Sequence, residues 1–259
     1  VGFYPFITLF LVCLMFRPVI FELWFHSVAK RVFWQRMFAL ASFGTIFLLG
    51  VVIGNLQGGM ILMPAAHGVP VFGGSLLSLL NPFALVTGLL LTVACVVHGA
   101  AWLIVKLEGE ARVDAKLALA RSWLIMVIVS VLWLLLLCVT VPGAVVNPAV
   151  WILAVLMAAD LVAIRVLAGH NAEKRLFVLT GLFFGLYWLS QAATQFPVMA
   201  RASNNPGLSL EAANSGGNPA TMSFLGTVAP VVLVIVLVYT VFVYRIFKGK
   251  VKPDAHKEY

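Results

Sequence analysis

The chain has 259 residues, of which 63% are hydrophobic and 10% are charged, and its formal net charge is +8. A soluble domain carries about 25% charged residues, and a soluble chain of this length could not bury so much apolar surface in one core. A soluble fold is therefore excluded, and membrane lipid must cover part of the surface. Nucleic-acid binding is also excluded, because the basic residues lie at the ends of apolar runs and not on one face.

Seven apolar stretches are long enough to cross a bilayer, which requires about 20 mostly apolar residues. They are continuous and lack the alternation of barrel strands, so they predict α-helices. We find no internal repeat and no soluble domain, and we expect one all-α polytopic transmembrane domain over residues 1–259. In chain order the predicted helices cover about 2–21, 37–57, 80–105, 119–141, 150–168, 176–196 and 224–247.

The basic residues predict the orientation of these helices. All of the 17 Lys and Arg residues except Arg201 lie in or beside alternate gaps between the stretches. Cytoplasmic loops accumulate Lys and Arg, so we expect the first residue outside and a cytoplasmic tail at about 248–259. Arg201 falls in an outer loop, where we expect it to be tolerated because the bias is statistical. The predicted outer loops are rich in Gly, Pro and Asn and lie at about 57–80, 141–149 and 197–222.

Glycines recur at a spacing of four residues in two of the predicted helices. Gly50, Gly54 and Gly58 lie in the second stretch and at its outer end, and Gly181 and Gly185 lie in the sixth. Small residues at this spacing let helix backbones approach closely. We therefore expect tight helix packing at both places, and the alternative is a groove for the tail of a ligand.

Few polar side chains lie in or beside the predicted helices. Asp160 is well inside the fifth, where a carboxylate is a candidate for proton transfer, although water or Arg165 five residues later would explain it as well. His98, in the third, could relay protons or ligate haem, or make a hydrogen-bonded contact between helices. At the inner end of the first helix, Arg17 and Glu22 are expected to form an interfacial ion pair of little energetic weight.

No local pattern of residues predicts catalysis or a metal site. The three cysteines lie inside apolar runs without a Cys-x-x-Cys pair, so neither a disulfide nor a zinc site is expected. The sequence lacks a Gly-rich phosphate loop, a His-Glu-x-x-His motif and a Gly-x-Ser-x-Gly motif. The residues alone therefore indicate a polytopic membrane protein without a catalytic constellation of its own.

Several short motifs, taken in order along the whole chain, resemble subunit II of the cytochrome bd-type quinol oxidases, including the cyanide-insensitive branch. Asn81-Pro82 also suits a helix start, because Asn caps helices and Pro fits their first turn. The residues that match the family are Arg17, Pro18, Glu22, Gly54, Asn55, Asn81, Pro82, His98, Gly99, Lys106 and Glu108.

This resemblance implies a non-catalytic, multi-pass subunit of a terminal oxidase in the bacterial cytoplasmic membrane, whose complex oxidises quinol and reduces dioxygen to water. It implies that haem b and haem d are bound mainly by subunit I, the expected partner. It also allows a structural quinone in this subunit and a small accessory subunit in the complex. A standalone transporter is the alternative, and it would require repeats and interrupted helices, which we do not find.

The chain also departs from the family's pattern. The family's first helix, the outer loop after it and the start of the second helix have no counterpart. The complete subunit has eight spans, so we expect this chain to be an N-terminally truncated subunit with seven. Asp160 does not match an acid of the family.

Overall fold

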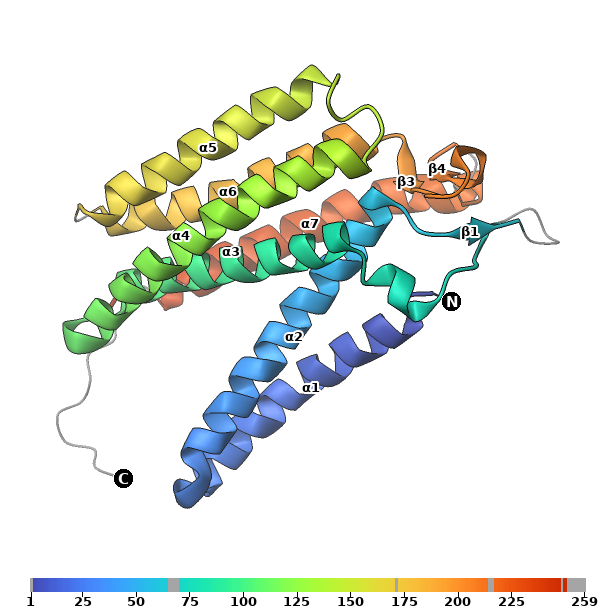
Figure 1. Cartoon of the computed structure of the whole chain (residues 1–259). Coiled ribbons are helices and arrows are strands. Elements are labelled where there is room, and N and C mark those ends of the chain that lie inside the picture. The colour runs from blue at the N-terminus through green and yellow to red at the C-terminus, as the bar shows by residue number, and fades with distance from the viewer. Residues whose placement is uncertain (1, 65–69, 171, 214–216, 248, 251–259) are drawn as a thin grey trace.

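The computed structural model describes residues 2–64, 70–170, 172–213, 217–247 and 249–250. Of the predicted cytoplasmic tail at about 248–259, all but Gly249 and Lys250 lies outside these residues. Seven long helices dominate this part of the chain (Figure 1), and all are long and apolar enough to cross a membrane. They are α1 (Tyr4–His26), α2 (Arg31–Gly58), α3 (Pro82–Lys106), α4 (Gly109–Thr140), α5 (Pro148–Ala168), α6 (Glu173–Gln195) and α7 (Pro219–Ile246).

The predicted helices are confirmed in number and in type, and they differ from the prediction mainly at their ends. The largest difference is at α4, which starts at Gly109, ten residues before the predicted apolar run. The added turns carry charged side chains, including Arg112 and Asp114. A helix satisfies its own backbone groups whether lipid or water surrounds it, so an apolar run defines the span and not the whole helix.

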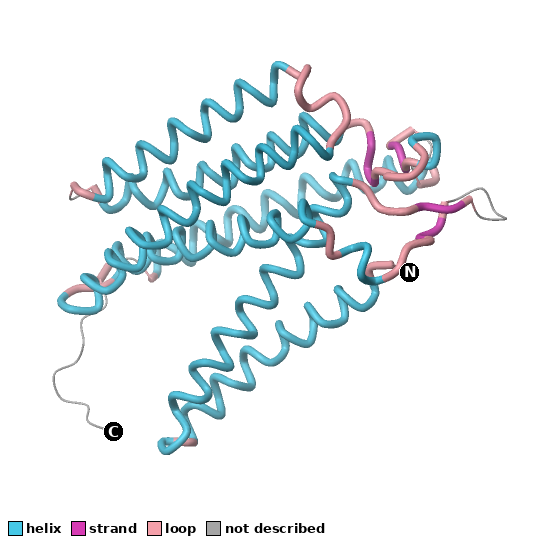
Figure 2. The backbone as a smooth tube through the Cα atoms, in the orientation of Figure 1, coloured by secondary structure: helices cyan, strands magenta, loops and turns pink. Residues whose placement is uncertain are grey.

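Two small antiparallel hairpins shape the loops at one end of the bundle, which we call the outer end (Figure 2). β1 (Leu62–Met63) pairs with β2 (Val71–Phe72), and β3 (Val198–Ala200) pairs with β4 (Leu210–Glu211). An isolated bridge between Met60 and Ala202 joins the two loops. Their apolar side chains form one small buried cluster of Met60, Leu62, Leu79, Ala200 and Ala202. We call the opposite end, with the α1–α2, α3–α4 and α5–α6 turns, the inner end.

Helices α3 to α6 form the main bundle, and the hairpin of α1 and α2 diverges from it toward the inner end (Figure 1). The largest buried apolar cluster belongs to α3–α6 and includes Phe83, Trp133, Phe183 and Tyr187. Only Ile20 is buried in α1, and no described residue of α7 is buried. Lipid or another protein must therefore cover most of α1 and α7.

Glycines bring the backbones of α2 and α3 into contact. A Cβ atom added at Gly50 would lie 2.6 Å from the Cα atom of Gly88, and one at Gly54 would lie 2.7 Å from the Cα atom of Ala84. A Cβ atom at Gly88 would lie 2.7 Å from the carbonyl oxygen of Phe47. The predicted tight packing is confirmed here, and the backbone of α3 fills the space that a ligand tail would need.

The second glycine pair does not pack in this way. A Cβ atom at Gly181 would meet only the His98 ring at 3.7 Å, and one at Gly185 would meet nothing within 4 Å. The prediction of close backbone packing is therefore wrong for α6. The spacing permits a close approach, but it does not supply a neighbouring backbone on that face.

We predict that Gly50→Ala destabilises the protein, because the new methyl group would overlap the α3 backbone and overpacking costs about 1–3 kcal/mol. Gly185→Ala is the matched control, since it adds the same group to a helix with open space around it. The measurement is the temperature at which the detergent-solubilised protein loses its monodisperse elution peak. Equal temperatures for the two variants would contradict the close approach of α2 and α3.

Candidate functional site

Asn55 and Asn81 link the outer end of α2 to the start of α3. Asn55 is fully buried, and its Nδ2 donates to the carbonyl oxygens of Val51 at 2.8 Å and Leu79 at 2.7 Å. Asn81 Nδ2 donates to Asn55 Oδ1 at 2.9 Å, and Asn81 Oδ1 accepts from the Ala84 amide at 2.9 Å. The predicted cap at Asn81 is confirmed, and its partner on α2 is a second residue of the family motifs.

Arg201, the basic residue that breaks the charge pattern, connects the carbonyl ends of α2 and α6. Its Nε donates to the carbonyl oxygen of Gln57 at 3.0 Å, and its Nη2 donates to that of Thr194 at 3.1 Å. The Gln57 side chain also donates to Thr194 Oγ1 at 2.6 Å. Burial lowers the pKa of Arg201, but a guanidinium remains protonated in proteins. The C-terminal ends of helices carry partial negative charge, so Arg201 has a structural role at this position.

His98 lies in α3 and contacts α6. Its Nδ1 lies 2.8 Å from Thr180 Oγ1, and its ring stacks on Phe177 with centroids 4.5 Å apart. The Thr180 hydroxyl donates its proton to the carbonyl oxygen of Phe177 at 2.9 Å, so His98 Nδ1 is the donor and Nε2 the acceptor of a neutral ring. The hydrogen bond that we expected between helices is present, while a role in proton transfer stays a prediction.

Asp160 lies in α5 with 5% of its surface exposed, and neither carboxyl oxygen has a hydrogen-bond partner. Compensation by Arg165 is wrong, because the Arg165 guanidinium lies 5.8 Å from the ring centroid of Trp123 on α4. The other explanation, a carboxyl group of Asp160 exposed to water, is wrong as well, because only 5% of the surface of this residue is exposed. Five residues turn the helix by about 140° beyond one full turn, so Asp160 and Arg165 leave α5 in different directions.

The same geometry separates Arg17 and Glu22 on α1, and the predicted ion pair between them is wrong. The Arg17 guanidinium lies 5.4 Å from the ring centroid of Phe38 on α2. Glu22 instead lies 3.5 Å from Nδ1 of His26, one turn further along. Pro18 lies inside α1 without ending it.

Lys106, at the inner end of α3, reaches the end of α7. Its Nζ donates to the carbonyl oxygens of Phe247 and Gly249, the latter at 3.2 Å, and lies 5.0 Å from the ring centroid of Trp102. Trp102 in turn lies edge to face with Tyr244 of α7, with centroids 5.4 Å apart. These contacts fix α7 against α3 near the inner end.

A second group of charges joins the inner ends of α4 and α6. Arg112 on α4 forms an ion pair with Glu173 on α6. Lys250 lies 3.8 Å from Glu173 and 3.9 Å from Glu108. The matched motif residues Lys106 and Glu108 therefore both take part in contacts that hold the end of α7 at the inner end. Among the described residues, no three His, Cys, Asp or Glu side chains come together as a metal site.

Most of the residues that make these contacts lie in the part of the chain that matches a known protein family. The family model of cytochrome bd terminal oxidase subunit II matches residues 1–247. The chain belongs to this family. It is 25% identical to a probable cytochrome oxidase subunit 2 of Haemophilus influenzae, over 98% of this chain and 75% of that protein.

Two further comparisons agree with this assignment. The chain is 23% identical to the cytochrome bd-I ubiquinol oxidase subunit 2 of Escherichia coli K12, over 100% of this chain and 78% of that protein. Its fold matches a chain of the bd oxidase structure from Geobacillus thermodenitrificans with a TM-score of 0.69. That match has 17% identity and covers 96% of this chain and 79% of the other. The chain is thus a multi-pass subunit II, and no finding supports a transporter.

The motifs of this subunit II chain identified residues at helix ends, but not all of their partners. Gly54, Asn55, Asn81 and Pro82 come together where α2 meets α3. Arg201 and Thr194 make further contacts between helix ends at the outer end of the bundle. The only sign of these contacts in the sequence was the position of Arg201, a basic residue in an outer loop. Their partners lie far apart along the chain, so no local spacing could have paired them.

We predict that Asn55→Ala lowers the thermal stability of the protein, because the Leu79 carbonyl and the Asn81 amide lose a buried partner, at about 1–3 kcal/mol. The control is Asn205→Ala, because Asn205 caps an exposed 3₁₀ turn (Pro206–Leu208) in the outer loop. Both variants would be compared by thermal unfolding in detergent. If Asn205→Ala unfolds at the same temperature as Asn55→Ala, the buried hydrogen bonds of Asn55 make no specific contribution to thermal stability.

Proposed function

We propose that this chain is the membrane subunit II of a terminal oxidase that oxidises quinol and reduces dioxygen to water, and that it holds and covers a haem-bearing subunit I. The observation that carries this proposal is the family match over residues 1–247. The Escherichia coli relative is named as a ubiquinol oxidase subunit. A bacterial inner membrane is the location that these relatives support.

Haem b and haem d are proposed to lie mainly in subunit I. The histidines of the described residues support this. The His98 ring packs between Phe177 and Phe184, with ring centroids 4.5 Å and 5.7 Å away, while His26 and His170 lie exposed at helix ends. A haem held within this chain would need an axial ligand directed into a large cavity, and these rings serve helix contacts and ends.

The surface for subunit I is proposed to lie on α7 and on the hairpin of α1 and α2. Residues of α2 in its inner half, such as Phe33 and Leu40, are exposed because the hairpin diverges from the main bundle (Figure 1). The α7 helix exposes apolar side chains on all sides. A helix that is apolar all round is a membrane span or is buried in a larger core.

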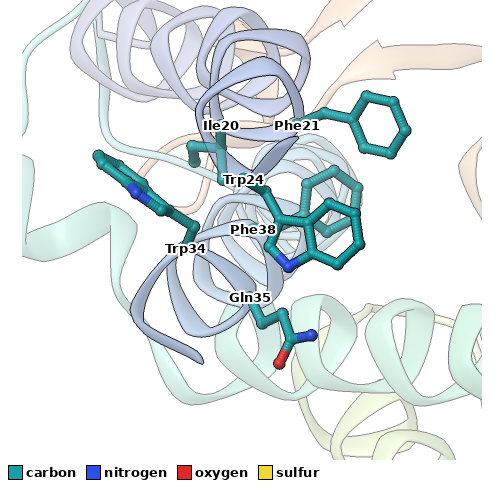
Figure 3. Close-up of a pocket in the computed structure, with 6 residues that line it drawn as sticks. All are labelled: Ile20, Phe21, Trp24, Trp34, Gln35 and Phe38. Carbon is teal, nitrogen blue, oxygen red and sulfur yellow. The ribbon is translucent and has the colours of Figure 1, made fainter. Parts of the chain in front are cut away.

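A structural quinone is proposed for a groove of about 280 Å³ near the inner ends of α1 and α2 (Figure 3). The groove suits the group chemically, because its walls are apolar and the indole N–H donors of Trp24 and Trp34 have no partner within the described residues. The two quinone carbonyls are acceptors that would satisfy such donors. The lining residues are Ile20, Phe21, Trp24, Trp34, Gln35 and Phe38. A small accessory subunit remains a prediction from the family resemblance.

The inner end is proposed to face the cytoplasm, and with it the end of the chain. Lys and Arg gather at this end, as expected of cytoplasmic loops. Lys106 and Lys250 connect the last described residues to α3 and α6 there. The basic residue at the outer end, Arg201, is accounted for by its bonds to the ends of α2 and α6.

Co-purification tests the proposed function. An affinity-tagged form of the chain, expressed in its own host, is expected to retain a partner that shows haem absorption and to yield quinol-dependent oxygen consumption. A tagged membrane protein of unrelated family from the same membranes is the control. A chain that elutes alone in mild detergent, without haem or oxidase activity in the eluate, would refute the proposal and return a transporter to consideration.

A further inference from the structure

A groove with two basic residues at its rim lies between α5 and α6 at the inner end of the bundle. Its volume is about 380 Å³, and it is lined by Leu167 of α5 and by Lys174, Arg175, Val178 and Leu179 of α6. The two cations belong to the first turn of α6, and the valine and leucine of this helix follow one turn further into the membrane domain. No acidic side chain of the described residues lines the groove. Positive charge therefore adjoins an apolar wall.

The acid nearest in the sequence does not neutralise these two cations. Glu173 forms an ion pair with Arg112 of α4 and lies 3.8 Å from Lys250. Its carboxylate is therefore directed toward α4 and the last described residues, and not into the groove. Lys174 and Arg175 are both exposed, and neither forms an ion pair within the part of the chain that the structure describes. The rim of the groove thus carries two uncompensated positive charges.

The groove continues as an exposed apolar strip along α6. An α-helix turns by about 100° per residue, so residues separated by whole turns share one face. The face that begins with the two cations continues with four exposed residues, which we call the apolar strip: Val178, Leu182, Gly185 and Leu189. A Cβ atom added at Gly185 would meet nothing within 4 Å. The strip is therefore apolar throughout and has open space at the glycine.

The length of the apolar strip matches one leaflet of a bilayer. A helix rises by about 1.5 Å per residue, so Val178 and Leu189 lie about 16 Å apart along the helix axis. The hydrocarbon core of a bilayer is about 30 Å thick, and one leaflet takes about half of it. An acyl chain that enters beside Lys174 and Arg175 therefore has apolar contacts as far as the middle of the membrane.

The two cations at the rim determine which headgroup fits. Arg forms paired hydrogen bonds with phosphate oxygens, and Lys binds phosphate as a point charge. Both side chains keep the charged end in water while their stems lie along apolar surface. Basic pockets between transmembrane helices on the cytoplasmic side bind anionic lipid headgroups. A lipid with a net negative charge therefore complements the groove, whereas a zwitterionic lipid brings a further cation to it.

We propose that this groove binds one anionic phospholipid, whose phosphate accepts hydrogen bonds from Lys174 and Arg175 and one of whose acyl chains lies along the apolar strip. The site lies apart from the surface proposed for subunit I, because α5 is on the opposite side of the main bundle from the hairpin of α1 and α2 (Figure 1). Binding of the lipid does not rest on the proposed oxidase function.

Native mass spectrometry of the purified, delipidated protein with its partners tests the site. The probes are phosphatidylglycerol and phosphatidylcholine with identical acyl chains, and one phosphatidylglycerol is expected to bind more tightly than phosphatidylcholine. The double variant Lys174→Gln and Arg175→Gln is expected to lose this preference, at about fivefold in affinity for each cation, since a basic residue near a lipid surface contributes about 1 kcal/mol.

The matched control is the double variant Lys116→Gln and Arg121→Gln, which removes the same charge from α4, outside the groove. It is expected to keep the preference for phosphatidylglycerol. Equal affinity of the unmodified protein for the two lipids would overturn the proposal. So would a preference that survives in the groove variant, or one that both double variants lose to the same extent.

A second pair of variants distinguishes a lipid from a free anion. Val178→Trp fills the groove without changing its charge and is expected to weaken phosphatidylglycerol binding severalfold. Val155→Trp adds the same group to an exposed valine of α5 outside the groove and should leave binding unchanged. Inorganic phosphate in excess should not displace the lipid. Displacement by phosphate, or unchanged lipid binding in Val178→Trp, would show that the acyl chain does not occupy the groove and would refute the proposal.

Discussion

The backbone contact between α2 and α3 determines the geometry of the rest of the molecule. Lipid is as apolar as the helix surfaces, so there is no hydrophobic gain from bringing spanning helices together and close packing must stabilise them. Gly50, Gly54 and Gly88 allow this packing in the outer half of α2. The same contact brings Asn55 within reach of Asn81 and thereby helps to start α3. Beyond this contact the hairpin of α1 and α2 diverges from the main bundle (Figure 1), and side chains such as Phe33 and Leu40 in the inner half of α2 are exposed.

The polar side chains fall into two groups with different consequences. At both ends of the bundle, buried or charged groups bind backbone carbonyls or opposite charges, as Arg201, Lys106 and Arg112 do. These contacts hold the helices together. Within the helices, by contrast, Asp160 on α5, Trp133 on α4 and Gln191 on α6 have polar atoms that no described residue satisfies. A subunit that supports a haem-bearing partner needs the first group.

The features of the fold that depend on a local pattern of residues could be predicted from the sequence. Long apolar runs determined the seven helices, because an unpaired backbone is too costly in lipid, and Asn81-Pro82 determined the start of α3. Contacts between distant segments could not be predicted in this way. The bonds of Arg201 to Gln57 and Thr194 bring together three loop and helix ends that no spacing relates. Two proposed pairings, Arg17 with Glu22 and Asp160 with Arg165, failed for one reason: a separation of five residues places side chains on different faces of a helix.

We propose that this chain supports an oxidase without binding haem itself. The most direct measurement is the absorption spectrum of the chain purified without subunit I, in a sample whose helical circular dichroism shows that it is folded. We expect no haem absorption in this sample, while the complex with subunit I carries it. Haem in a stoichiometric amount in the lone, folded chain would contradict the claim.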